Sequence, residues 1–206
     1  MAGSDVQSTF ILSSDIAAAD PDGVCAAQTT GGAANLTING ALATAGVATL
    51  LPARNVTITS AGSSETGKTL TITGTDVNGN AVTESIAGPG GSATVATTAI
   101  FSTVTQVAVD SALTGNVTVG SGTSLSATIF AGRARIRGIY FVNSTTAGTL
   151  NFVDGNNGPS VMKIQTTGTE KTSDYPDIPD EGLLCATGAY VNFTATHVTA
   201  LTVFYN

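Results

Sequence analysis

The sequence has few charged and aromatic residues and a single histidine. Of its 206 residues, 10% are charged and 5% aromatic, with no tryptophan, two cysteines and one histidine. Because His197 is alone, neither a multi-histidine metal site nor a histidine relay beyond one imidazole can form. We expect His197 in a turn or at the surface, and we expect no catalytic, cofactor-binding or metal-binding residues.

Long apolar runs are also missing. No run approaches the roughly 18 residues that a membrane helix needs. The opening Met1-Ala-Gly-Ser-Asp5 has no basic segment of the kind that begins a signal peptide. We therefore expect synthesis in a cytosol, with no membrane partner.

Positive charge is scarce. The net charge is −7 and the sequence pI is about 4.3, whereas proteins that bind the phosphate backbone cluster Lys and Arg. We expect no nucleic-acid partner. Cys25 and Cys185 lie far apart among small apolar neighbours, a setting that favours buried free thiols over a disulfide.

The abundant residues are Thr, Ala, Gly, Val and Ser. β-Branched residues suit a pleated sheet, and Gly, Asn and Ser supply turns, so the composition predicts an all-β fold. Small side chains gain little on burial, at roughly 25 cal/mol per Å². Units of this kind usually need an additional source of stability, and we expect it to be oligomerisation.

Residues 1–52 are predicted to form an extended arm. Its only bulky apolar cluster before Leu36 is Phe10-Ile11-Leu12, and short strands are expected at 36–39 and 47–51. An arm that cannot bury its own apolar residues packs on a neighbour or stays mobile. Phe10, Ile11 and Leu12 are therefore candidate interface residues.

Residues 53–122 alternate with period two, which predicts about seven short strands in a small immunoglobulin-like sandwich. Asn78-Gly79 predicts a hairpin, which is favoured over a calcium loop because Ala81 replaces the glycine that such a loop requires. A change of parity predicts a bulge near Thr105-Gln106. Glu84 indicates an edge strand or a bulge.

Residues 123–206 are predicted to form a compact jelly-roll-like β domain around a strand at 133–142. On strict alternation, one face of that strand carries Arg133, Arg135 and Arg137 and then Ile139 and Phe141. The apolar end of this face needs a cover, which could be another chain. The last strand, 198–205, is expected to contribute to the core.

The three arginines repel one another unless carboxylates pair with them. The acidic stretch 174–182 supplies Asp177, Asp180 and Glu181, in the same or in a neighbouring subunit. For this stretch, a solvated loop and a cation site are the alternatives. Both groups are candidate inter-subunit or capsid interface residues.

Several segments resemble modules of structural proteins in the virions of tailed bacteriophages. The first module is carried by 53–62, 70–84 and 101–106, and a second by 132–140, 178–184 and 198–205. The resemblance implies a non-enzymatic virion protein, of the type that decorates or cements the capsid surface. It also implies synthesis in the host bacterial cytoplasm, a homotrimer, and the major capsid protein as partner.

Two other functions remain open. A tail or head fibre module that binds a host receptor or glycan is the first, although the tyrosines are few and mostly lie in strand patterns. The second is a glycan hydrolase, which needs two positioned carboxylates.

Overall fold

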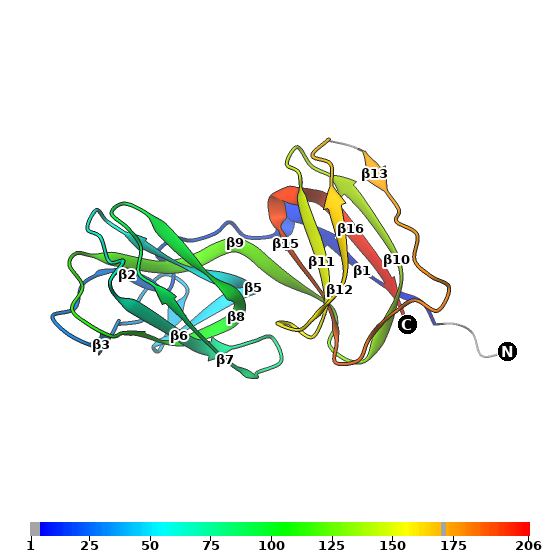
Figure 1. Ribbon diagram of the computed structural model, residues 1–206. Helices are drawn as coiled ribbons and strands as arrows, with labels where there is room; N and C mark the ends of the chain where they lie inside the picture. The colour runs from blue at the N-terminus through cyan, green and yellow to red at the C-terminus, as the bar shows by residue number, and fades with distance from the viewer. Residues whose placement is uncertain (1–4, 170–171) are drawn as a thin grey trace. The chain divides into compact units, whose positions relative to one another are not determined.

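The computed structural model describes residues 5–169 and 172–206 and is all-β, with 57% of residues in strands (Figure 1). The strands form two antiparallel sheets. By contacts the chain divides into two compact units. We call residues 18–123 the continuous unit, and residues 5–17 together with 124–206 the discontinuous unit.

The strands of the continuous unit belong to one hydrogen-bonded sheet. Its strands are β2 (Cys25–Gln28), β3 (Ala34–Asn35), β4 (Ala43–Thr44), β5 (Val47–Ser60), β6 (Thr69–Thr75), β7 (Ala81–Ala87), β8 (Thr94–Val109) and the first half of β9 (Val117–Phe130). They are ordered β9-β5-β8-β6-β7, with β2 on β9, β3 on β8 and β4 on β5. Alternate Val, Ile and Leu side chains, such as Val56, Ile58, Leu70 and Ile72, are buried in its core.

Two local predictions for this unit are confirmed. β6 and β7 form the hairpin around Asn78-Gly79, and Gly79 has a φ of 81°. Asp76 holds the turn, because its Oδ1 accepts the backbone N–H groups of Asn78 and Asn80 at 2.8 and 2.9 Å. The bulge lies at Thr105, since β6 pairs Thr73 with Gln106 but Gly74 with Val104.

Glu84 lies on an edge strand, because β7 ends the path of the sheet. Its carboxylate accepts the backbone N–H groups of Thr98 and Ala99 at 3.0 and 2.7 Å. At that point the pairing of β8 with β5 shifts register. Glu84 therefore satisfies backbone donors that an irregular ladder leaves without a strand partner.

The discontinuous unit encloses its core between two layers. The chain contributes β1 (Gln7–Leu12), η1 (Ser13–Asp15), the second half of β9, β10 (Ala134–Asn143), β11 (Gly148–Asp154), β12 (Ser160–Thr166), β13 (Ser173–Asp174), β14 (Leu183–Cys185), β15 (Ala189–Thr194), η2 (Ala195–His197) and β16 (Val198–Tyr205). One layer is the five-stranded sheet β1-β16-β10-β13, in which β14 also pairs with β10, and the other is β12-β11-β15-β9. Phe141, Phe152 and Leu201 are fully buried in this core, and β16 contributes to it as predicted.

The predicted arm is not a separate element. β1 pairs residue for residue with β16, from Gln7 opposite Tyr205 to Leu12 opposite Ala200. Residues 18–52 belong to the continuous unit, where they place five buried side chains, Val24, Cys25, Leu36, Ala48 and Leu50, in its core. Most of these side chains are widely spaced in the sequence, so no regular period marked them as core residues.

Cys25 and Cys185 are free and buried, as predicted. Burial raises the pKa of Cys25 to about 12. Burial, with a smaller contribution from the charge of Asp154, raises that of Cys185 to about 11. His197 is half-buried at the end of η2, in the connection between β15 and β16.

Candidate interaction surface on the five-stranded sheet

The face of β10 that seemed to change from charged to apolar does not exist. β16 pairs Tyr205 with Ile136 but Phe204 with Gly138, so Arg137 is the extra residue of a bulge. The bulge changes the parity of the strand, and Ala134, Ile136, Ile139 and Phe141 are all buried in the core as a result. Another chain is not needed to cover Ile139 and Phe141.

The same bulge leaves Tyr140 on the outer face of the five-stranded sheet. Its neighbour there is Thr202 of β16, which in turn lies opposite Phe10 of β1. Phe204, one row away, is diagonal to both rings. Phe10 is 63% exposed and Tyr140 is 40% exposed, so aromatic side chains from three strands gather on one exposed face.

Tyr175, which follows β13, completes this group. It is 61% exposed, yet its ring reaches back over the sheet at Gly138. A Cβ built on Gly138 would lie 2.6 Å from Tyr175 Oη and 3.3 Å from Phe204. Glycine at this position therefore lets Tyr175 approach the backbone of β10. We call Phe10, Tyr140, Tyr175 and Phe204 the aromatic face.

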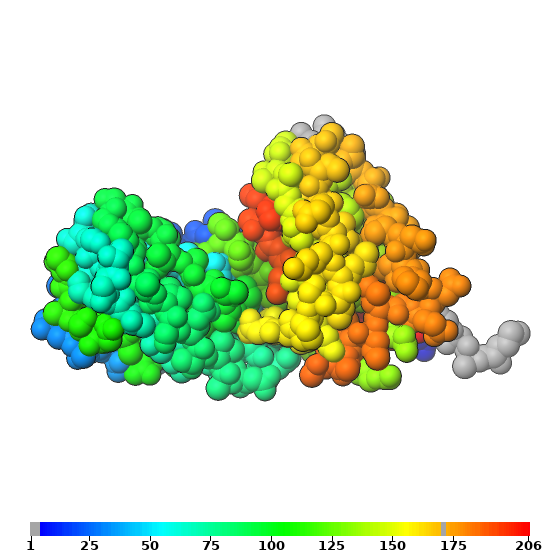
Figure 2. Space-filling view, viewed as in Figure 1, coloured from blue at the N-terminus to red at the C-terminus, as the bar shows by residue number. Residues whose placement is uncertain are grey.

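The predicted charged groups lie at the β10 side of this face. The segment 174–182 runs between β13 and β14, which both pair with β10, and Figure 2 shows it in orange on the surface of the discontinuous unit. Arg135 Nη1 donates to the carbonyl of Glu181 at 2.9 Å, and Arg137 Nη1 to that of Asp180 at 2.6 Å. The predicted meeting of arginines and acidic loop is therefore made through the backbone.

The carboxylates of that loop are not used in these contacts. Asp177, Asp180 and Glu181 are exposed. In the described part of the chain, the ion pair within 4.0 Å joins Lys68 to Glu65, so none of the three arginines is paired with a described carboxylate. Opposite charges thus stand next to one another without being paired.

The predicted apolar interface residues divide between the two faces of β1. Phe10 is on the aromatic face, and Leu12 is half-buried on the same side. Ile11 points the other way and packs against the core. The sequence did not single out Tyr140, Tyr175 or Phe204 as surface residues. The parity change at Arg137 is the signal that could have identified Tyr140.

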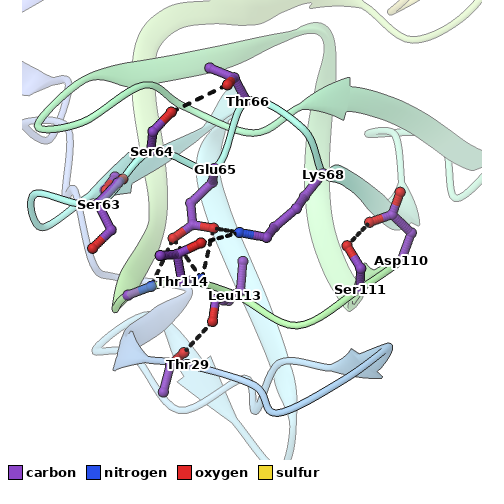
Figure 3. A network of polar contacts seen from close by, with 12 residues as sticks. Thr29, Ser63, Ser64, Glu65, Thr66, Lys68, Asp110, Ser111, Leu113 and Thr114 are labelled. Carbon is purple, nitrogen blue, oxygen red and sulfur yellow. Dashed lines mark hydrogen bonds and ion pairs between the residues drawn. The ribbon is translucent and has the colours of Figure 1, made fainter.

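The continuous unit also contains a buried polar cluster that was not predicted from the sequence. In the continuous unit, Glu65 is fully buried, and its carboxylate accepts the backbone N–H groups of Thr114 and Gly115 at 2.8–3.0 Å (Figure 3). Lys68 Nζ donates to Glu65 Oε2 and to Thr114 Oγ1. Burial opposes ionisation of Glu65, but these donors outweigh it and hold the pKa of Glu65 below its usual value.

Both carboxylate oxygens of Glu65 are therefore occupied by protein donors. The cluster joins the loop between β5 and β6 to the loop between β8 and β9. We interpret it as a structural link between these loops, with no free oxygen directed at solvent.

A shallow hollow of about 330 Å³ lies elsewhere on the discontinuous unit. It is lined by Ser13, Ser14, Ser144, Thr145, Thr146, Ala195, Thr196 and Val198. Ser13 Oγ and Ser144 Oγ already donate to the carbonyls of Thr199 and Thr196. Over residues 5–169 and 172–206, no three His, Cys, Asp or Glu side chains gather as metal ligands, and no helix is long and apolar enough to cross a membrane.

The aromatic face with its charged border is thus the most distinctive surface of the described chain. Tyr and Arg side chains are enriched at protein interfaces, whereas a monomer rarely leaves several aromatic rings together in water. In comparisons of the chain with protein-family models, with curated proteins and with solved structures, none matched.

Proposed function

We propose that this chain is a structural virion protein of a tailed bacteriophage, of the type that decorates and cements the outer surface of the capsid. It acts by association and not by catalysis, in the assembled virion. The observation that carries the proposal is the aromatic face bordered by unpaired charges of both signs. The resemblance of 53–62, 70–84 and 101–106, and of 132–140, 178–184 and 198–205, to modules of phage virion proteins supplies the biological setting.

The proposal also covers the assembly and the finer fold. We expect a homotrimer, synthesised in the host cytoplasm, whose partner is the major capsid protein. The continuous unit is proposed to be immunoglobulin-like and the discontinuous unit jelly-roll-like. The antiparallel strands, the separate cores of the two units and the two layers of the discontinuous unit support this description.

Stability supports a role that depends on association. The two cores are filled mostly by Val, Ile, Leu and Ala side chains. By contrast, Phe10 and Tyr175 leave much of their apolar area exposed to solvent. Covering these rings in a larger assembly would remove apolar area from water and so add stability.

The direct test is binding of the purified protein to empty phage heads. We expect saturable binding and an increase in the temperature at which the heads break open. Heads incubated with a Phe10→Ser, Tyr175→Ser variant serve as the matched control, since both positions are exposed. Absence of binding and of any stabilisation would refute the proposal.

A fibre module that binds a host glycan is the second candidate, and one observation favours it. Tyr140 and Tyr175 are exposed near Asp174 and Asp177, and aromatic rings beside polar groups can support a sugar. Binding of the protein to host cells, competed by cell-surface glycans, would favour this function over the capsid role.

A further inference from the structure

The aromatic face carries charges that the chain does not neutralise itself. Arg135 and Arg137 lie on β10 and Arg133 is exposed just before it, and four exposed carboxylates, Asp174, Asp177, Asp180 and Glu181, lie on the segment 174–182. Among the described residues, none of these groups forms an ion pair. The loop nevertheless lies within reach, since Arg135 and Arg137 bind its carbonyl oxygens.

This arrangement restricts the kind of partner that fits. A purely acidic partner would attract the arginines but repel the acidic loop. A purely basic partner would attract the loop but repel the arginines. A surface with charges of both signs can pair with the arginines and with the carboxylates at once, as interfaces with complementary potentials do. One surface known to carry both signs, next to exposed aromatic rings, is the same face on another copy of this chain.

We infer that the partner at the aromatic face is a second copy of this chain. The arginines of one copy pair with Asp177 and Asp180 of the next, and the aromatic rings are buried between the copies. This inference rests on the proposed function only in that both require association. It goes further by naming the aromatic face as the contact surface and a second copy of the chain as the partner. Ion pairs next to a dry aromatic centre are screened less by salt than exposed ones.

Charge reversal tests this contact. A basic-side variant carries Arg135→Glu and Arg137→Glu, and an acidic-side variant carries Asp177→Lys and Asp180→Lys. Each is expected to sediment as a monomer at concentrations where the unaltered chain is assembled, because like charges then meet. Mixed in equal amounts, the two variants are expected to form mixed dimers, since the contact between unlike variants is again complementary, whereas a closed ring of three would contain one contact between like variants.

A variant with all four substitutions separates pairing between copies from effects within one chain. It is expected to assemble with itself as the unaltered chain does, but not with the unaltered chain. Because Arg135 and Arg137 also hold the loop, Arg135→Gln with Arg137→Gln provides a second basic-side variant that keeps amide donors. Circular dichroism and thermal unfolding of each variant establish that it is folded.

The readout is molar mass by sedimentation, together with binding to empty heads. Unchanged assembly of both charge-reversed variants, or failure of the mixture to associate, would overturn the inference. A monomeric unaltered chain that binds heads would also overturn it, and would refute the expected homotrimer, while leaving the proposed capsid role standing. A chain that assembles through this face but does not bind heads would support the inference and refute the proposed capsid role.

Discussion

Phe10 on β1 and Tyr140 on β10 lie in one row across the five-stranded sheet, with Thr202 of β16 between them. Both rings are exposed, although Ile11 and Phe141, the residues that follow them, face the core. Neighbouring residues on β1 and β10 therefore allow the proposed role of the aromatic face in association to be tested separately from the stability of the core.

Phe10→Ala and Ile11→Ala form a matched pair on β1. Ile11 is half-buried against the core, so Ile11→Ala should lower the free energy of unfolding by about 1–2 kcal/mol, below the range for fully buried residues. Phe10→Ala should change it by no more than about 0.5 kcal/mol, as at most surface sites. Thermal unfolding followed by circular dichroism measures both effects.

In assembly assays Phe10→Ala should have the larger effect of the two substitutions, the reverse of their order in thermal unfolding. Phe10→Ala is expected to weaken association, because it removes an exposed ring from the aromatic face, whereas Ile11→Ala keeps that face. Sedimentation at several protein concentrations provides the measurement. Equal association of both variants with that of the unaltered chain would contradict a role for Phe10.

Gly74→Ala should destabilise the continuous unit. A Cβ at Gly74 would lie 1.9 Å from the backbone oxygen of Thr103, next to the bulge at Thr105, and neither strand can move aside cheaply. We expect a loss of about 1–3 kcal/mol in the free energy of unfolding, typical of overpacking. Gly31→Ala, where a Cβ meets nothing within 4 Å, is the control and should be close to neutral.

Acid should weaken the continuous unit through Glu65. Because the folded chain holds the pKa of Glu65 below its usual value, its contribution is complete above the ordinary carboxyl pKa of about 4.3. That contribution is lost as the pH falls through the depressed pKa. Glu65→Gln should cost roughly 1–3 kcal/mol near neutral pH, as for hydrogen bonds to charged groups.

The difference in stability between the unaltered chain and Glu65→Gln should therefore shrink on acidification. Urea unfolding between neutral and strongly acidic pH provides the measurement, and a difference independent of pH would contradict the assignment. Asp154→Asn is the counterpart in the discontinuous unit. Burial opposes ionisation of Asp154, but the N–H groups of Ala186, Thr187 and Gly188 and the Thr187 hydroxyl outweigh it and lower its pKa.

Both thiols should resist alkylation in the folded protein. With pKa values of about 12 for Cys25 and about 11 for Cys185, almost no reactive thiolate is present near pH 8, and both side chains are buried. Iodoacetamide should label both cysteines rapidly in guanidinium chloride and slowly without it. Mass spectrometry distinguishes the two, and fast labelling of either in native buffer would contradict its burial.

Local patterns in the sequence predicted local structure well. The hairpin at Asn78-Gly79 and the bulge at Thr105 follow from turn chemistry and from a change in parity, which depend on neighbouring residues alone. The bulge at Arg137 produces the same change in parity. It was missed because charged residues on one side of it suggested a continuous face with a changing role.

Glycines were harder to interpret. The predicted boundary after residue 122 falls at Gly120-Ser121-Gly122, close to the division between the two units after Thr123, yet β9 continues through it. A Cβ at Gly120 would lie 2.1 Å from the carbonyl oxygen of Asp20, and one at Gly122 would lie 2.3 Å from Asn55 Oδ1. These glycines make room for chain segments distant in sequence, which a turn-based interpretation cannot detect.

The candidate surface could be predicted only in parts. Phe10, the arginines and the acidic loop were each identified as interface candidates, but their common sheet depends on the pairing of β1 with β16. Such a pairing joins residues far apart in the chain, and no local pattern in 7–12 specifies it. Tyr175 was hidden for the same reason, because its position depends on Gly138.

The pairing of β1 with β16 also sets the order in which the protein can be completed during synthesis. A ribosome releases β1 early and β16 late, so β1 emerges without the strand that it needs. The continuous unit has all its residues once Thr123 has emerged, and can close its core first. Until translation reaches β16, the nascent chain therefore carries an uncharged strand with an open edge, which is the stage at which a chaperone would be of most use.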